Sequence, residues 1–134
     1  MTKDTFSGVN TRKLLILDDD VPFRNRLVRA MEKRGFTVTS ACSVAEGLQA
    51  AHDDVPSYAV LDIRLTDGSG LDVVAALRQA NPDARIIMLT GYGNIATAVA
   101  AVKAGAVDYL PKPADADVIA SALLDHDGAL AAAG

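Results

Sequence analysis

A run of four residues that favour burial, followed by one carboxylate, constrains this chain more than any other feature: Tyr58-Ala59-Val60-Leu61-Asp62. Turn-forming residues follow it, at Thr66-Asp67-Gly68-Ser69-Gly70. An apolar run of this length between polar turns is typical of a central parallel strand buried on both faces. Its last residue, Asp62, then lies at the carboxyl end of the strand, where open α/β sheets bind their ligands.

Five strand patterns alternate with five helix patterns along the chain. Such alternation predicts an α/β fold in which a parallel sheet is covered by helices on both faces, with right-handed crossovers. The 36–41 run is the least apolar, so we expect it near an edge of the sheet. The strands are expected over 13–17, 36–41, 58–62, 85–89 and 107–110, and the helices begin near Pro22, Ser43, Leu71, Asn94 and Asp115.

Each helix pattern predicts an apolar face and, in some cases, its ends. Ser43 followed by Glu46 forms a capping-box pattern. Gly35 and Gly105 each end a helix. The residues expected on apolar faces are Phe23, Leu27, Ala30 and Met31 in the first helix; Val44, Leu48 and Ala51 in the second; Leu71, Val74 and Leu77 in the third; Ile95, Val99 and Val102 in the fourth; and Val118, Ile119, Ala122 and Leu123 in the fifth.

Length and composition limit the class of protein. The 134 residues, of which 50% are hydrophobic, suffice for one domain with one core. A net charge of −4 argues against this chain being the part of a protein that grips DNA or RNA. The single Cys42 rules out an internal disulfide. No apolar stretch approaches the roughly 20 residues of a membrane span, and the N-terminus lacks a signal-peptide core. We therefore expect a cytoplasmic protein, with a loose leader over 1–12, a folded domain over 13–125 and the start of a linker over 126–134.

Chemically reactive residues follow four of the five strands. The first strand is followed by Asp18-Asp19-Asp20, the third ends in Asp62, the fourth ends at Thr90 and the fifth leads to Lys112. In a parallel sheet these ends share one edge, with neighbouring strands about 4.8 Å apart. Carboxylates this close repel one another, and a hard cation such as Mg²⁺, which prefers oxygen ligands, relieves the repulsion.

A carboxylate beside Mg²⁺, with a hydroxyl and an ammonium opposite, can accept a phosphoryl group. An aspartate can act as the nucleophile, and the cation and lysine stabilise the charge on the transferred oxygens. No His or Cys lies near these positions, which argues against zinc; His52 and His126 are expected in solvent. Taken singly, each residue has a plainer explanation as a turn, cap or surface residue, but the four together in this order favour a phosphoryl-accepting site.

At this point the sequence resembles the receiver domain of bacterial two-component response regulators. The resemblance covers roughly residues 13–124. A further likeness, to the RegA/PrrA/ActR group of redox-responsive transcriptional regulators, lies in 91–99, 103–106 and 112–116. The motifs that carry the family resemblance are Leu17-Asp18-Asp19-Asp20, Val60-Leu61-Asp62, Met88-Leu89-Thr90-Gly91 and Tyr109-Leu110-Pro111-Lys112-Pro113.

The resemblance implies a flavodoxin-like, doubly wound (βα)5 fold with a five-stranded parallel sheet in the order 2-1-3-4-5. It implies that Asp62 is the phosphoacceptor and that Thr90 and Lys112 hold the phosphoryl oxygens. Asp19 would bind Mg²⁺ directly, Asp18 partly through water, and the Arg64 backbone carbonyl would be a further ligand alongside Asp62. Tyr109 would turn inward with Thr90 on phosphorylation, and the Lys112-Pro113 bond would be cis.

The family's partners also follow only from the resemblance. A sensor histidine kinase would donate the phosphoryl group, and the surface of the fourth helix, fifth strand and fifth helix would then change and bind a partner, often a second receiver. The chain would not be an enzyme beyond promoting its own phosphotransfer and dephosphorylation. Control of transcription would need a helix-turn-helix domain outside these residues; a stand-alone receiver that acts through protein contacts is the alternative.

Two positions depart from the family pattern. Thr66 stands where proline is common, so the loop after Asp62 is expected to be more mobile. Asp20 is a third consecutive acid and is expected to face solvent, although a role in tuning the metal site is the alternative.

Two rival functions remain open from the residues alone. Haloacid-dehalogenase-type phosphatases also use an Asp nucleophile with Mg²⁺, and Asp18-x-Asp20 superficially fits, but Pro22 or Phe23 stands where that motif requires Thr or Val. A non-phosphorylatable binding module with the same fold is disfavoured because all four functional side chains are present.

Overall fold

The computed structural model describes residues 12–91, 95–106, 108–112 and 114–124, with side chains at all of these except 95, 97 and 98. Its main sheet has five parallel strands in the order β2-β1-β3-β6-β7. Numbered among themselves, these strands have the expected 2-1-3-4-5 order, and the strand at 36–41 lies at an edge. The strands are β1 (Arg12–Leu17), β2 (Phe36–Ala41), β3 (Tyr58–Asp62), β6 (Arg85–Thr90) and β7 (Asp108–Pro111).

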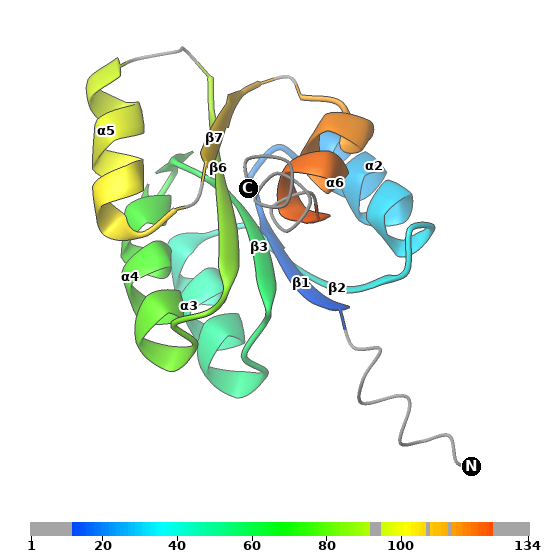
Figure 1. The fold of residues 1–134 in the computed structure, drawn as a ribbon, viewed down its shortest axis with the longest axis horizontal. Helices are drawn as coiled ribbons and strands as arrows, with labels where there is room; N and C mark the ends of the chain where they lie inside the picture. Colours follow the sequence, from blue (N-terminus) through cyan, green and yellow to red (C-terminus); the bar gives the residue numbers. More distant parts are fainter. Residues whose placement is uncertain (1–11, 92–94, 107, 113, 125–134) are drawn as a thin grey trace, which may run out of the picture.

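Helices cover both faces of this sheet, as Figure 1 shows. On one face α2 and α6 pack through Phe23, Leu27, Ile119 and Leu123. On the other face lie α3, α4 and α5. The core is therefore two apolar layers separated by the sheet, as a doubly wound fold requires. The helices are α2 (Val21–Glu32), α3 (Val44–Asp53), α4 (Gly70–Ala80), α5 (Ile95–Ala104) and α6 (Ala116–Leu124).

The three inner strands carry the most deeply buried residues. Leu14–Leu17 in β1, Ala59–Leu61 in β3 and Ile86–Leu89 in β6 are each at most 1% exposed. Full burial of a Leu or Ile side chain stabilises a fold by about 1.5–3 kcal/mol relative to exposure. The apolar runs thus hold the inner strands firmly in place, and with them the polar residues at their carboxyl ends.

Local capping explains where the first two helices begin. The exposed Asp20 side chain accepts a hydrogen bond from the Phe23 N–H (3.1 Å) and caps α2. Ser43 Oγ accepts from the Glu46 N–H (3.1 Å), as the capping box predicts, but the Glu46 carboxylate accepts from Cys42 N–H rather than from that of Ser43. The solvent-facing position expected for Asp20 is confirmed, and its side chain also serves as a helix cap.

The apolar face predicted for α3 is partly wrong. Leu48 is 38% exposed, whereas Gly47 is buried between the sheet and α4. A Cβ at Gly47 would lie 3.1 Å from side-chain carbons of both Leu17 and Val73. The helix therefore approaches the core through its glycine, and Leu48 is turned outward, where it lines a shallow groove between α3 and α4.

Three other helix faces also differ from the prediction. In α5, Val99 and Val102 are 47% and 55% exposed, and Ala101 is buried instead. The Ile95 side chain lies outside the described residues. In α6, Val118 is exposed, and in α4, Leu71 is only half-buried while Val73 is buried. An Ala-rich helix is apolar all round, so its period does not identify the inner face.

A small hairpin follows β3 that the sequence patterns do not predict. Strands β4 (Arg64–Leu65) and β5 (Gly68–Ser69) pair antiparallel, with Thr66 and Asp67 at the turn. Two-residue strands are too short to show a period of alternation. The hairpin places a defined backbone conformation directly after Asp62, where only a turn was expected.

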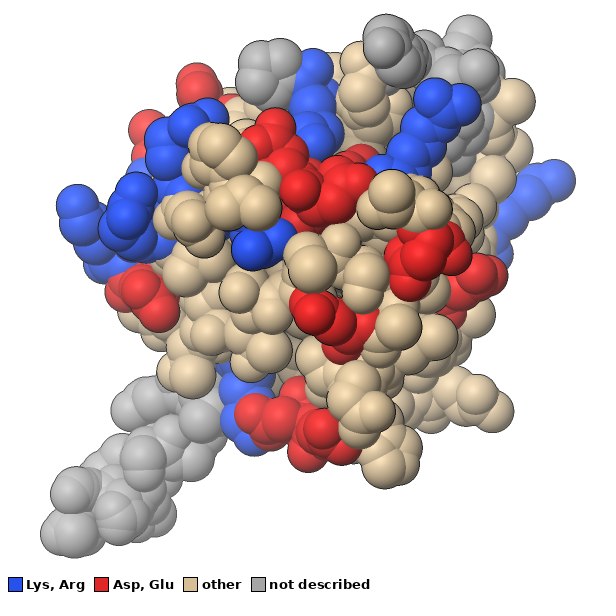
Figure 2. Space-filling view, turned by 180° about the vertical axis from the view of Figure 1, so that it is seen from behind, with Lys and Arg blue, Asp and Glu red and all other residues tan. Residues whose placement is uncertain are grey.

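Charge is distributed unevenly over the surface. In Figure 2, Lys and Arg side chains are densest on the side where α2 lies, and acidic residues are spread over the rest of this face. Helix α2 carries Arg24, Arg26 and Arg29 but only one acid, Glu32. The net charge of −4 therefore describes the whole chain and not each of its faces. Within the described ranges, no helix is long and apolar enough to cross a membrane.

Candidate functional site

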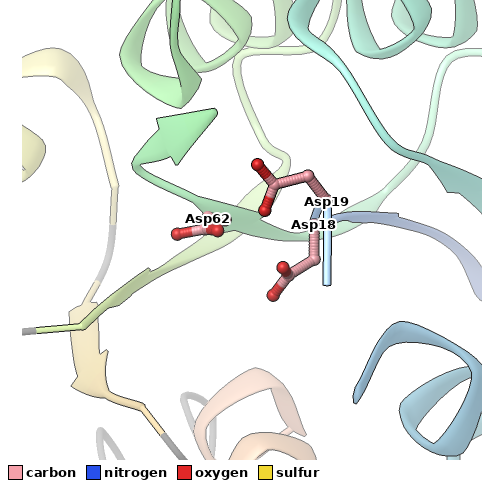
Figure 3. Close-up of side chains that lie close together, drawn as sticks. All are labelled: Asp18, Asp19 and Asp62. Carbon is pink, nitrogen blue, oxygen red and sulfur yellow. The ribbon is translucent and has the colours of Figure 1, made fainter. Parts of the chain in front are cut away.

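Three carboxylates meet at the carboxyl edge of the sheet. Asp18 and Asp19 follow β1 and Asp62 ends β3, and Figure 3 shows the three side chains grouped at the neighbouring ends of these strands. One oxygen from each carboxylate lies within 4.8 Å of those of the other two. Asp18 is fully buried and Asp62 is 6% exposed, whereas Asp19 is exposed. The ends of β1 and β3, two of the four strand ends that the sequence singled out, thus bring three acids together.

The buried Asp18 carboxylate is held by a cation and a backbone amide. Its Oδ1 accepts from the Asp20 N–H (2.9 Å) and from Lys112 Nζ (3.2 Å), and its Oδ2 lies 2.9 Å from the same ammonium. The geometry at Oδ2 is not that of a hydrogen bond, and this buried oxygen has no hydrogen-bond donor among the described residues. Arg24 supports the same turn by donating to the Asp18 backbone carbonyl (2.9 Å). Both oxygens of Asp18 are thus close to the Lys112 ammonium, which compensates the burial of this carboxylate.

Lys112 bridges the acids and is positioned by three neighbours. Its Nζ lies 3.5 Å from Asp62 Oδ2 and 5.1 Å from the centroid of the Phe23 ring, over which the ammonium sits. Its backbone N–H donates to the Thr90 carbonyl (2.7 Å). Burial alone would lower the pKa of Lys112, but the hydrogen bond to Asp18 and the charges of Asp62 and Asp18 outweigh burial and raise it. The lysine therefore stays protonated among the acids.

Burial and charge raise the pKa of Asp62 from 3.8 to about 6. Burial is the largest cause, followed by repulsion from Asp18; Lys112 and a hydrogen bond donated by the Arg64 backbone N–H oppose the rise. At neutral pH this carboxylate is ionised against the preference of its surroundings. A bound cation would remove that penalty, so the electrostatics of the site favour occupation by a positive ion.

The donor set fits Mg²⁺. Three carboxylates with oxygens within 4.8 Å of one another supply the hard oxygen ligands that this ion prefers. Within the described part of the chain, neither the acidic cluster nor its contacts include a His or Cys side chain. His52 is exposed on α3, as expected, and His126 lies outside the described residues.

The other residues singled out by the sequence lie at the same edge or beside it. Thr90 is buried (5% exposed) at the end of β6, next to β3. Arg64 begins the hairpin after Asp62, with its side chain exposed. Tyr109 is 36% exposed on the outer strand β7, so its ring is not packed inside. The Lys112-Pro113 bond falls outside the described residues, since Pro113 is among those left out.

Three residues near the site were not singled out for it by the sequence. Gly70 opens α4 so close to β3 that a Cβ would lie 2.1 Å from the Asp62 carbonyl oxygen. Phe23 lies beside Lys112. Asp67 binds backbone amides of α3 from the turn of the hairpin. Gly70 and Asp67 both belong to the turn cluster after Asp62, but the contacts of Asp67 with α3 and of Phe23 with Lys112 join residues far apart in the sequence, which no local pattern indicates.

Solved structures of other proteins share this architecture. A response regulator from Burkholderia pseudomallei, described with a phosphorylated aspartic acid, a calcium ion and citrate, superposes with a TM-score of 0.81 at 40% identity, over 92% of this chain and 73% of that one. A CheY-like receiver domain protein from Methanospirillum hungatei gives a TM-score of 0.82 at 26% identity, over 92% and 99% of the two chains.

Curated relatives are similar over most of this chain. RegA, a photosynthetic apparatus regulatory protein of Cereibacter sphaeroides, is 63% identical over 113 residues, which are 84% of this chain and 61% of that protein. ActR, an acid tolerance regulatory protein of Rhizobium meliloti, is 61% identical over 117 residues, or 87% and 60% of the two. The chain thus spans about three-fifths of the length of these relatives, and it matches the RegA and ActR group that its motifs resemble.

The family model for the response regulator receiver domain matches residues 14–124. That range contains both acidic strand ends, the hairpin, Thr90 and Lys112. The chain therefore belongs to the response regulator receiver domain family of two-component signalling proteins.

Proposed function

We propose that Asp62 accepts a phosphoryl group from a sensor histidine kinase and that Mg²⁺ assists the transfer. The observation that carries this proposal is the convergence of Asp62 with Asp18, Asp19 and Lys112 at one sheet edge. An Asp62 oxygen attacks phosphorus, the bond from phosphorus to the donor imidazole nitrogen breaks, and an acyl phosphate forms on Asp62. We place this exchange in the cytoplasm, following the family resemblance.

The ion would be held by Asp19, Asp62, the Arg64 backbone carbonyl and, partly through water, Asp18. When bound, it supplies positive charge that neutralises the transferred oxygens. The Lys112 ammonium lies 3.5 Å from Asp62. Thr90 is buried at the end of the adjacent strand, where its hydroxyl would hold a phosphoryl oxygen. Lys112 is already paired with Asp18, so its charge is in place before a phosphoryl group arrives.

We further propose that phosphorylation changes the surface formed by α5, β7 and α6 and favours a dimer. Three exposed apolar residues on these elements support this: Val102 on α5, Tyr109 on β7 and Val118 on α6. The backbone bond between Lys112 and Thr90 links the site to this surface, because it joins the ends of β6 and β7. Thr90 and Tyr109 are the proposed switch residues, and a population shift of a few kcal/mol suffices.

The relatives are named as regulatory proteins of photosynthesis and acid tolerance, and this chain spans about three-fifths of their length. We propose that the whole protein controls transcription through a DNA-binding domain outside these residues. The chain itself then acts as a signalling module and not as an enzyme with an external substrate. A receiver that works alone through protein contacts is the alternative, which the sequence after Gly134 would decide.

A labelling experiment tests the phosphoacceptor and the rival phosphatase chemistry together. The chain and its Asp62→Asn and Asp18→Asn variants are incubated with Mg²⁺ and a radiolabelled small phosphodonor such as acetyl phosphate. The proposal requires that label is lost in Asp62→Asn. Loss in Asp18→Asn with retention in Asp62→Asn would instead support an aspartate-nucleophile phosphatase that uses the first strand. Size-exclusion chromatography with beryllofluoride and Mg²⁺ checks the dimer: an unchanged elution volume would contradict the proposed switch.

A further inference from the structure

The turn of the hairpin after Asp62 is fastened to a helix distant in sequence. The Asp67 carboxylate accepts hydrogen bonds from the N–H groups of Val44 (2.8 Å) and Ala45 (3.1 Å), in the first turn of α3. These two bonds lower the pKa of Asp67, so the side chain is ionised at neutral pH, where it also interacts favourably with the helix N-terminus. The tip of the hairpin is therefore attached to α3, a helix that ends more than ten residues before the hairpin begins.

The base of the same segment is attached to the sheet. The Ile63 N–H donates to the Leu89 carbonyl (3.1 Å), and the Gly70 N–H donates to the Ile63 carbonyl (2.8 Å). Between base and tip, the Arg64 N–H donates to the Asp62 carboxylate. Residues 63–70 thus form a loop that is held at its base by the sheet and at its tip by α3. The Arg64 backbone lies beside Asp62, to whose carboxylate its N–H donates.

Helix α3 has caps of its own besides Asp67. Ser43 accepts from the Glu46 N–H, and the Glu46 carboxylate accepts from the Cys42 N–H. Asp67 satisfies two further amides that helix geometry leaves without partners. A carboxylate that comes from the hairpin does more than a local cap, because it also fixes the hairpin in space.

We propose that Asp67 is a positioning residue for the cation site: by fastening the hairpin to α3, it holds the Arg64 backbone beside Asp62. This inference rests on the proposed Mg²⁺ site and names a residue that supports it without contacting the ion. It also accounts for Thr66, which stands where the family commonly has proline. Thr66 lacks the ring by which proline would stiffen the turn, and the two Asp67 hydrogen bonds restrain the turn in its place.

The sign of the backbone angle φ at position 66 does not exclude proline. No non-glycine residue in the described ranges has a positive φ, so Thr66 has a negative φ, and Leu65 before it is in an extended strand. Proline needs a negative φ, favours an extended preceding residue and suits the first central position of a turn. Thr66→Pro can therefore stiffen the hairpin independently of Asp67.

The experiment measures the affinity for Mg²⁺ alone, by calorimetry or NMR titration, in the 134-residue chain. Asp67→Ala is compared with the charge-matched control Asp72→Ala, which removes an exposed acid from the first turn of α4. We expect Asp67→Ala to weaken Mg²⁺ binding by about tenfold, the low end for outer-shell partners of metal ligands. The control should change it by less than about twofold, since surface charges are screened.

The double variant Thr66→Pro/Asp67→Ala separates positioning from stability. It should recover Mg²⁺ affinity to within about twofold of the unmodified chain, while its melting temperature stays lowered because the α3 amides still lack their acceptor. Faster hydrogen exchange at Arg64 in Asp67→Ala, reversed in the double variant, is the expected parallel readout.

Two results would overturn the inference while leaving the metal site intact: equal affinities in Asp67→Ala and Asp72→Ala, or no recovery in the double variant. The second result would mean that the effect arises from charge or from loss of the α3 cap. If the unmodified chain does not bind Mg²⁺, the proposed metal site itself fails, and the inference falls with it.

Discussion

Replacing Asp62 by asparagine should stabilise the metal-free protein at neutral pH. The folded protein raises the pKa of Asp62 from 3.8 to about 6, mainly through burial and then through the Asp18 charge. The folded state therefore holds this proton more tightly than the unfolded chain. Asp62 favours folding at pH values below about 4, and this contribution is lost as the pH rises through 6.

The size of the effect follows from the two pKa values. Each pH unit between them corresponds to about 1.4 kcal/mol. Ionising Asp62 near pH 6 in place of 3.8 thus costs the folded state about 3 kcal/mol at neutral pH. Asparagine keeps the shape of the protonated side chain without its titration, so Asp62→Asn should be about 2–3 kcal/mol more stable than the unmodified chain at pH 7.5.

Urea denaturation in EDTA at pH 7.5, 5.5 and 4 measures this difference directly. The stability gained by Asp62→Asn should shrink as the pH falls and approach zero at pH 4. Asp72→Asn, which alters an exposed acid on α4, is the control and should show no such trend. A difference between Asp62→Asn and the unmodified chain that stays constant from pH 4 to 7.5 would refute the electrostatic reasoning. Added Mg²⁺ should reduce the difference at pH 7.5 by stabilising the unmodified chain more than the variant, which lacks one carboxylate ligand.

Three further predictions concern packing and charge at and below the site. Gly70→Ala should lower the free energy of unfolding by about 1–3 kcal/mol, because the added Cβ would lie 2.1 Å from the Asp62 carbonyl oxygen. The control is Gly91→Ala, whose Cβ would meet nothing within 4 Å, and equal losses in the two variants would contradict the packing argument. Lys112→Gln should destabilise the protein by about 1–3 kcal/mol at pH 7.5, since it leaves the buried Asp18 without its cation; an unchanged denaturation midpoint would argue against the ion pair. Leu77→Ala should lower the free energy of unfolding by about 2–5 kcal/mol and Leu48→Ala by less than about 1 kcal/mol, because Leu77 is fully buried and Leu48 is 38% exposed. Similar losses in the two variants would mean that Leu48 packs in the core.

The sheet and the ends of its strands could be predicted because they depend on local patterns. An apolar run such as Leu14–Leu17 predicts a buried strand, and a polar residue directly after the run then lies at the end of that strand. Parallel pairing then places Asp18, Asp62 and Thr90 at one edge without knowledge of the side-chain contacts. Which residues meet at this edge of the sheet could therefore be predicted from the sequence.

The helix faces and the loop contacts could not be predicted because they depend on packing between distant segments. Gly47 rather than Leu48 faces the core of α3, since a residue without a side chain allows the helix to approach Leu17 and Val73. In α5, where almost every residue is apolar, no period distinguishes Ala101 from Val102. The bonds from Asp67 to α3 span more than twenty residues, and no local motif records such a contact.

The pairing of Lys112 with Asp18 also lay beyond the sequence. The resemblance assigns Lys112 to the phosphoryl oxygens, whereas the structure places its ammonium nearer to Asp18 (2.9 Å) than to Asp62 (3.5 Å). A buried carboxylate requires a compensating charge, and the lysine provides it. A phosphoryl group on Asp62 would therefore compete with Asp18 for the Lys112 ammonium, whose charge already contributes to the stability of the fold.

The most direct test of the central claim is to map the phosphorylated residue. The chain is incubated with acetyl phosphate and Mg²⁺, and the digested protein is examined by mass spectrometry, with circular dichroism to confirm that it is folded. We predict a single phosphoryl adduct, located on Asp62 in the peptide that contains the end of β3 and abolished by EDTA. An adduct on Asp18 or Asp19, or a folded protein with no adduct on Asp62, would contradict the claim that Asp62 is the phosphoacceptor.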